Sequence, residues 1–321
     1  MKNKLIGFVV VLGISGCATS PMKNSVPVPS VPMIISTQSH SNKSPSSCAV
    51  HQSQVNQEIQ NHDLDRLDNL LATLKSQPDC PSAYLDDVKR NMAYIAAAQA
   101  SRSMEQAQLS EAKAWLERAP MRVWSTQVVR GDIAAYDKQW RNAAQYFNQA
   151  IDLINDPQTT PEKPAQSEIN EVFESVLDAQ LLAGEVVGSI RQRIPIPKET
   201  RSIRVDSGYP MPVQFDFGGN KMSPKGKKST QKLADYLKRL GATDINLIGH
   251  TDTKGSHRIN DQISKQRALA VKSYLGKLGV STRIDTEGKG KREPLSLPRW
   301  KNLTRLEIDQ RNRRVEFRII N

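Results

Sequence analysis

Two oppositely charged side chains in the last third of this 321-residue chain stand at positions suited to binding chemistry. Asp252 follows a short apolar run, where a strand should end and a loop begin. Arg267 borders the apolar stripe of the next predicted helix. A carboxylate accepts hydrogen bonds from an ammonium group, and a guanidinium holds a carboxylate through two parallel hydrogen bonds. The pair could therefore bind a ligand that carries both charges, or Asp252 and Arg267 could simply pair with each other.

Other residue types that often carry chemistry form no recognisable constellation. His250 beside Asp252 suggests acid–base chemistry, but no nucleophile or second base stands at a recognisable spacing. The Gly288–Lys291 segment has neither the spacing of a phosphate loop nor a helix after it. No CxxC pair or His–Cys cluster has metal-ligand spacing. We therefore expect no enzymatic activity, no metal and no cofactor.

The segment from residue 205 to 321 has a mixed α/β pattern, which predicts an α+β domain that places these two charges. Its expected order is β-α-β-α-β, then a long insertion, then β. One helix should begin after Ser223-Pro224 and end at Gly241, because a serine cap, an early proline and a terminal glycine suit helix ends. The second predicted helix is 260–278, and the predicted strands are 213–217, 245–248, 283–286 and 314–320.

The segment from residue 48 to 190 has helical periodicity and predicts an all-α domain. Ala143, Phe147 and Ala150 form a small-large-small pattern, and a similar pattern stands 31 residues upstream. This resembles the tetratricopeptide repeat, in which small residues let neighbouring helices approach closely. A plain helical bundle fits the pattern equally well. If the repeats are real, their groove should hold a segment of a protein partner or stabilise self-assembly. A regular leucine stripe marks one helix of this domain: Leu64, Leu67, Leu70, Leu71 and Leu74.

The first residues have the form of an export signal. A cationic start precedes the apolar run Leu5–Ile14, which is shorter than the roughly 20 residues of a transmembrane helix. Ile14-Ser15-Gly16-Cys17 resembles the bacterial lipobox, which implies a signal peptide over 1–16 and lipidation of Cys17. Ala18 in place of an aspartate implies delivery to the periplasmic face of the outer membrane. An ordinary secretory signal is the alternative.

Two segments are expected to lack regular structure. Residues 17–47 are rich in serine and proline and predict a disordered tether, and residues 191–204 predict a connector. Cys48 and Cys80 follow the tether. A periplasmic address allows a disulfide bridge between these two residues, which we favour, and free buried thiols are the alternative.

The net charge of +12 suggests an anionic neighbour. The export signal argues against nucleic acid. Five lysines of the helix after Ser223 and its approach form either a solvated face or a surface attracted to anionic wall or lipid: Lys221, Lys225, Lys227, Lys228 and Lys232.

Several motifs of residues 205–321 occur in the order of one known family. The segment resembles the OmpA C-terminal-like peptidoglycan-binding domain. This resemblance implies that the ligand is peptidoglycan, that Asp252 holds the ammonium of a diaminopimelate stem residue, and that Arg267 holds its carboxylate. It also implies neighbouring polar contacts from Thr251, Asn260, Asn220 and Arg314. The motifs are Gly249-His250-Thr251-Asp252, Gly255, Asn260, Ile263-Ser264, Arg267-Ala268, Gly288, Pro294 and Asn312-Arg313-Arg314-Val315.

The sequence therefore predicts an outer-membrane lipoprotein that binds peptidoglycan non-covalently and links the membrane, or an envelope assembly, to the cell wall. In the alternative, the chain belongs to a secretion or envelope machine, its helical domain recruits protein partners, and wall binding only positions that domain. The basic insertion 295–311, which carries Trp300, is expected near the site and could alter the ligand range.

Overall fold

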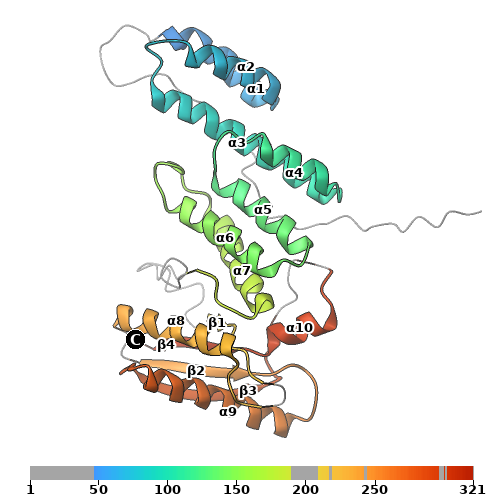
Figure 1. Cartoon of the computed structure of the whole chain (residues 1–321), viewed down its shortest axis with the longest axis vertical. Helices are drawn as coiled ribbons and strands as arrows, with labels where there is room; N and C mark the ends of the chain where they lie inside the picture. The colour runs from blue at the N-terminus through green and yellow to red at the C-terminus, as the bar shows by residue number, and fades with distance from the viewer. Residues whose placement is uncertain are drawn as a thin grey trace, which may run out of the picture.

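The computed structural model describes residues 47–188, 209–216, 219–241, 244–295, 300 and 302–320. The predicted signal peptide, Cys17, all of the tether except Ser47, and the connector lie outside the described residues. The described chain forms a helical part, residues 47–188, and a mixed α/β part, residues 209–320, which lie end to end (Figure 1). No helix within these ranges is both long enough and apolar enough to cross a membrane.

The helical part is a succession of packed helices, as the periodicity predicts. In Figure 1 they stack from the short first helices down to α7, which lies against the α/β part. Leu67 and Leu74 of the predicted leucine stripe are fully buried. The elements are η1 (Ser47–His51), α1 (Gln52–Asn61), α2 (Leu64–Lys75), α3 (Ser82–Glu105), α4 (Leu109–Glu117), α5 (Trp124–Tyr136), α6 (Trp140–Ile154) and α7 (Gln166–Ala183).

The close approach of α5 and α6 depends on Gly131. A Cβ atom at this glycine would lie 2.4 Å from Cε1 of Phe147, which is fully buried. Ala143 and Ala150, on either side of Phe147 in the sequence, are also fully buried. The small-large-small pattern therefore marks a real helix contact. Assignment of this part to the tetratricopeptide repeat stays a prediction.

The α/β part contains a four-stranded sheet with the order β1-β4-β2-β3. β2 is parallel to β3 and antiparallel to β4, and β1 is antiparallel to β4. The order β-α-β-α-β, insertion, β and the α+β class are confirmed. The elements are β1 (Tyr209–Met211), α8 (Pro224–Leu240), β2 (Asp244–His250), α9 (His257–Lys277), β3 (Arg283–Gly290), α10 (Arg305–Asn312) and β4 (Val315–Ile320).

The helix α8 begins and ends where its terminal residues require. Ser223 Oγ accepts a hydrogen bond from the Gly226 amide at 3.1 Å, and Pro224 takes the first helical position. Gly241 ends the helix in the left-handed region, with φ of 64°. Leu233 and Leu237 on its inner face are almost fully buried in the core of the α/β part.

Three strand predictions need correction, one of them because β3 runs from Arg283 to Gly290 and does not end at residue 286. The first strand is 209–211 and not 213–217, because the chain turns after Met211, whose carbonyl accepts from the Val213 amide at 2.8 Å. Phe215 makes only an isolated bridge with Met222. Strand β2 continues through Gly249 and His250, which were predicted as a loop. This strand position requires glycine, because a Cβ atom at Gly249 would lie 2.0 Å from the Ser264 carbonyl oxygen of α9.

The insertion between β3 and β4 carries the helix α10, which was not predicted. Figure 1 shows α10 beside the end of α7. Trp300 packs into the core of the helical part, with its ring 5.4 Å from that of Trp140 and 6.2 Å from that of Phe147. The described part of this insertion therefore connects the two parts of the molecule.

Candidate functional site

Arg267 projects from α9 and is almost entirely buried, with 5% of its surface exposed. Its Nε donates to the Gly219 carbonyl at 3.2 Å, and its guanidinium lies 5.1 Å from the ring centre of Phe215. Within the described part of the chain, no carboxylate forms an ion pair with it. Burial, and then the charge of Arg313, lower the pKa of Arg267 to about 10 against the opposing effect of Asp252, so the group remains a cation near neutral pH.

Asp252 follows β2 and pairs with Arg313, not with Arg267. Its Oδ2 lies 2.9 Å from Arg313 Nη1, and its Oδ1 accepts from the Lys254 amide at 3.0 Å. Asp252 is close enough to Arg267 to affect its pKa through charge. The structure thus brings Asp252 and Arg267 into one cluster of charges, and Arg313 is a third member that sequence reasoning missed.

A cavity of about 240 Å³ lies beside this cluster. Arg267 and Arg313 both line it, so its charged lining is cationic. A typical small-molecule pocket has about 300–1,000 Å³, so this one suits the end group of a larger molecule. Its other described lining residues are Leu181, Gly184, Pro212, Gln214, Phe215, Ser223 and Gln310.

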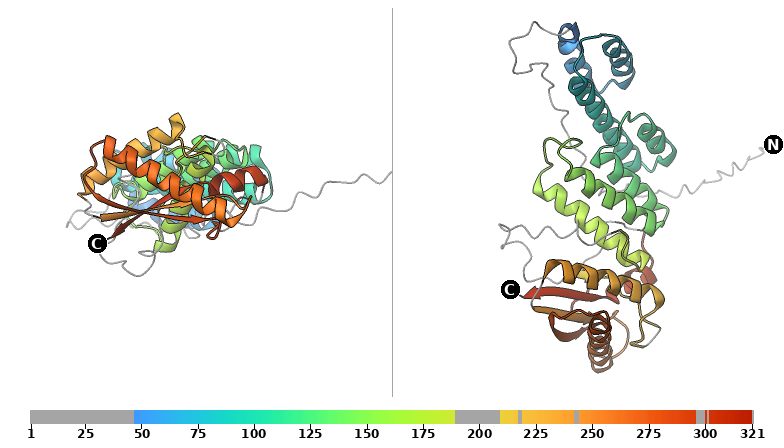
Figure 2. Two further views of the ribbon diagram at one scale, coloured as in Figure 1. Left: turned by 90° about the horizontal axis from the view of Figure 1, so that it is seen from below. Right: turned by 60° about the vertical axis from the view of Figure 1, so that its left-hand side comes forward.

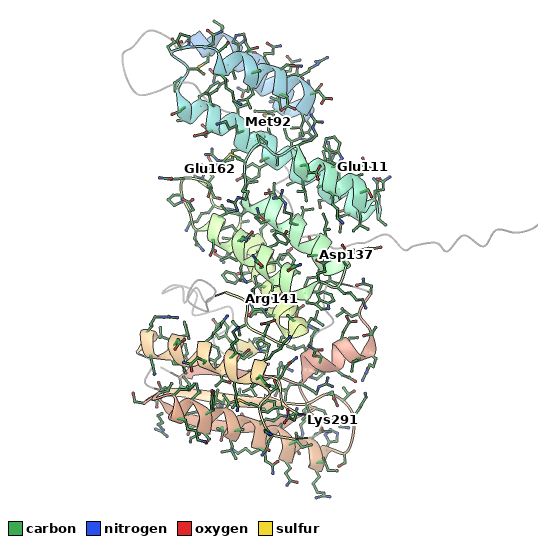
Figure 3. All side chains as sticks on the ribbon, in the orientation of Figure 1. Met92, Glu111, Asp137, Arg141, Glu162 and Lys291 are labelled. Carbon is green, nitrogen blue, oxygen red and sulfur yellow. The ribbon has the colours of Figure 1, made fainter. Side chains whose placement is uncertain are left out.

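Thr251 and Asn260 hold the loop after β2 and do not line the cavity. The Thr251 hydroxyl donates to the Asp252 carbonyl at 3.1 Å. Asn260 Nδ2 donates to the carbonyls of Lys254 and Ser256 at 2.6 and 3.0 Å. Lys291, labelled in Figure 3, donates to the Gly255 carbonyl at 2.7 Å. These contacts fix the loop that presents Asp252.

Arg314 belongs to a different, buried cluster. Its Nε donates to Glu316 Oε1 at 2.7 Å, and His250 Nε2 lies 3.5 Å from the same oxygen. Burial raises the pKa of Glu316, but the contact with His250 and the charge of Arg314 outweigh it and hold that pKa below its ordinary value. These contacts hold Arg314 within the fold, and its predicted contact with a ligand stays a prediction. Neither Arg314 nor the exposed Asn220 lines the cavity.

Two more predictions concern other residues. Among the described residues, no group of three His, Cys, Asp or Glu side chains could hold a metal ion. Cys48 and Cys80 are not joined by a disulfide in this structure and pack in one cluster, where Cys48 is buried and Cys80 half-buried. Burial, followed by a hydrogen bond with Cys48, raises the pKa of Cys80 to about 12.

Comparison with known proteins places the α/β part in a family. Residues 214–302 match the model of the OmpA family. Outer membrane protein A of Bordetella avium is 36% identical over 107 residues, which cover 33% of this chain and 53% of that protein. A peptidoglycan-associated lipoprotein of Buchnera aphidicola is 32% identical over 85 residues, which cover 26% of this chain and 49% of that protein. The chain thus spans about half the length of these relatives.

The peptidoglycan-associated lipoprotein from Burkholderia pseudomallei aligns with 28% identity over 34% of this chain and 88% of that chain, with a TM-score of 0.29. The family match and the sheet order together show that the C-terminal part of this chain is an OmpA-like domain.

Proposed function

We propose that this chain is an outer-membrane lipoprotein, anchored through Cys17, whose OmpA-like domain binds peptidoglycan through the diaminopimelate of its stem peptides. One end would lie in the membrane and the other on the wall, so the chain would attach one to the other without catalysing a reaction. The relatives support this role, since one of them is named a peptidoglycan-associated lipoprotein.

One observation carries the proposal. Arg267 is buried, cationic and without an ion-pair partner in the described chain, and it lines a cavity. A buried charge is costly unless it is paired, so this site favours an incoming carboxylate. The guanidinium can accept that carboxylate in a two-bond geometry.

Asp252 would supply the second contact. The free end of diaminopimelate carries an ammonium and a carboxylate on one carbon, so its site needs an anion next to a cation. Asp252 lies next to the cavity through its ion pair with Arg313. The ligand ammonium would replace Arg313 on this carboxylate.

Co-sedimentation of the full chain with purified sacculi tests this assignment. Asp252→Ala should weaken binding by about 10-fold or more, because a hydrogen bond to a charged group contributes about 1.5–3 kcal/mol. Asp285→Ala is the matched control, since this aspartate is exposed on β3. Equal binding by wild type and Asp252→Ala would rule out the proposed ligand contact.

A separate experiment addresses the anchor. Cys17→Ser should move the protein from the outer-membrane fraction to the soluble periplasmic fraction and should abolish incorporation of labelled fatty acid. Retention in the membrane with no change in labelling would contradict lipidation at this cysteine.

A further inference from the structure

The helical part forms one wall of the cavity that lies in front of Arg267. Leu181 near the end of α7 and Gly184, which follows that helix, both line it. Gly184 has φ of 67°, and a Cβ there would lie 1.8 Å from Gln214 Nε2 on the opposite wall. The two parts therefore meet at the cavity with no room for another atom at this point.

The same segment is fastened to α8. Lys225 Nζ donates to the Ala183 carbonyl at 3.3 Å, and Lys232 Nζ donates to the Val186 carbonyl at 2.7 Å. In the same segment, Glu185 pairs at 3.0 Å with Arg141 of α6, which is labelled in Figure 3. Figure 2 (right) shows α7 ending directly above α8. Two of the five predicted basic residues thus serve docking within the chain.

A second attachment runs through α10. Gln310 Nε2 donates to the carbonyls of Leu181 and Leu182 at 3.3 and 2.8 Å. Arg311 Nε donates to Asp178 Oδ1 of α7 at 3.1 Å, and both side chains are largely buried. Together with Trp300, these contacts hold α10 against the helical part.

The opposite side of α10 contacts the loop that presents Asp252. Lys254 Nζ lies 3.1 Å from Oδ2 of the fully buried Asp309, and Arg305 donates to the Thr253 hydroxyl. Arg313, the residue directly after α10, forms the ion pair with Asp252. One short helix therefore contacts both the helical part and the proposed ammonium site.

We infer that docking of the helical part is an autoinhibitory contact. It keeps the end of α7 against the cavity and holds Arg313 in its ion pair with Asp252. Release of α10 from α7 opens the site to peptidoglycan. This inference rests on the proposed function. The docked state disfavours the ligand in two ways. The ammonium must displace a guanidinium that α10 holds in place, and the rest of the stem peptide must pass the end of α7.

Two variants loosen the docking without touching Asp252 or Arg267. Trp300→Ala removes the ring that packs on Trp140 and Phe147, and Asp178→Asn removes the charge that pairs with Arg311. Full-length protein should bind sacculi about fivefold more tightly in each variant, a typical coupling between two sites. Hydrogen exchange over α10 should rise at the same time. Asp86→Asn is the control, because its ion pair with Lys89 is exposed and remote from the docking surface.

The outcomes separate this inference from the proposed function. Faster exchange in α10 with unchanged or weaker sacculus binding would overturn the autoinhibition while leaving peptidoglycan binding intact. Unchanged exchange in both variants would show that docking is not a separable state, which also overturns it. Failure of wild type and of both loosened variants to bind sacculi would instead refute the proposed function.

Discussion

Asp252 and Arg313 form an ion pair of 2.9 Å across the loop after β2, whereas pairing of Asp252 with Arg267 was the sequence's alternative to ligand binding. This pair leaves Arg267 buried beside the cavity, where it contacts the Gly219 carbonyl and the Phe215 ring. In this arrangement Arg313 neutralises Asp252, and Arg267 faces the cavity without a carboxylate partner among the described residues. The ammonium of a zwitterionic ligand would replace Arg313 on Asp252, and its carboxylate would pair with Arg267.

The guanidinium at position 267 should matter for its shape as well as its charge. Arg267→Lys keeps a cation but offers no planar pair of donors, and we expect sacculus binding to fall by about 10-fold. Circular dichroism should show an intact fold. Arg283→Lys, at an exposed position on β3, is the matched control. Full binding by Arg267→Lys would indicate that the site recognises charge alone.

Glu316 should contribute to stability in a pH-dependent way. Its pKa is lowered in the folded protein, so its contribution is present above the pKa of the unfolded chain and is lost as the pH falls through the folded value. Glu316→Gln leaves Arg314 buried without its partner and should cost about 3 kcal/mol near neutral pH. Denaturant unfolding at several pH values should show this difference shrinking below about pH 4.

Glu287→Gln provides the comparison for this series, because the Glu287 side chain on β3 is 45% exposed and pairs with the partly exposed Lys289. It should have little effect at any pH. A constant difference between wild type and Glu316→Gln across the pH range would show that the carboxylate charge is not what stabilises the cluster.

Gly131 should tolerate no side chain. Gly131→Ala places a methyl group against the buried ring of Phe147 and should destabilise the helical part by about 1–3 kcal/mol. Gly276→Ala in α9 meets nothing within 4 Å and should stabilise by up to about 1 kcal/mol. Thermal unfolding of the two variants should therefore shift in opposite directions. Equal shifts would mean that α5 and α6 separate easily.

Cys48 and Cys80 should form a disulfide when the protein matures in an oxidising compartment. Both thiols lie in one cluster, and closing a loop of about 30 residues stabilises by about 3–4 kcal/mol in the chain-entropy model. Denatured protein from the periplasm should show no thiol that reacts with maleimide, and reductant should lower its melting temperature. Cys80→Ser should remove that sensitivity. Two reactive thiols in wild type would establish the reduced form.

The sequence predicted the elements that have local signals. Ser223, Pro224 and Gly241 mark the ends of α8 through capping and backbone preference, which need no knowledge of the rest of the fold. The alternation of Val315 and Phe317 likewise marked β4, and both residues are buried. The first strand was misplaced because the apolar alternation continues past Met211, where the chain turns.

The site was less predictable because it depends on contacts between distant elements. Arg313 and Arg314 are adjacent and chemically identical, so only the start of β4 decides which one enters the cavity. Periodicity identifies the buried face of a helix but not the element that covers it. For this reason no local pattern indicated that Trp300 would pack on α6, or that the end of α7 would line the cavity.

The positions of Trp300 and Val186 have a practical consequence for expression of the OmpA-like domain alone. Val186 belongs to the apolar core of the OmpA-like domain, although it precedes the first strand of that domain. A fragment that starts at residue 205 would lack the buried Val186 side chain and would expose the Trp300 indole to solvent. Such a fragment should aggregate more readily and be less stable than the intact protein. A useful expression boundary therefore lies N-terminal to α7.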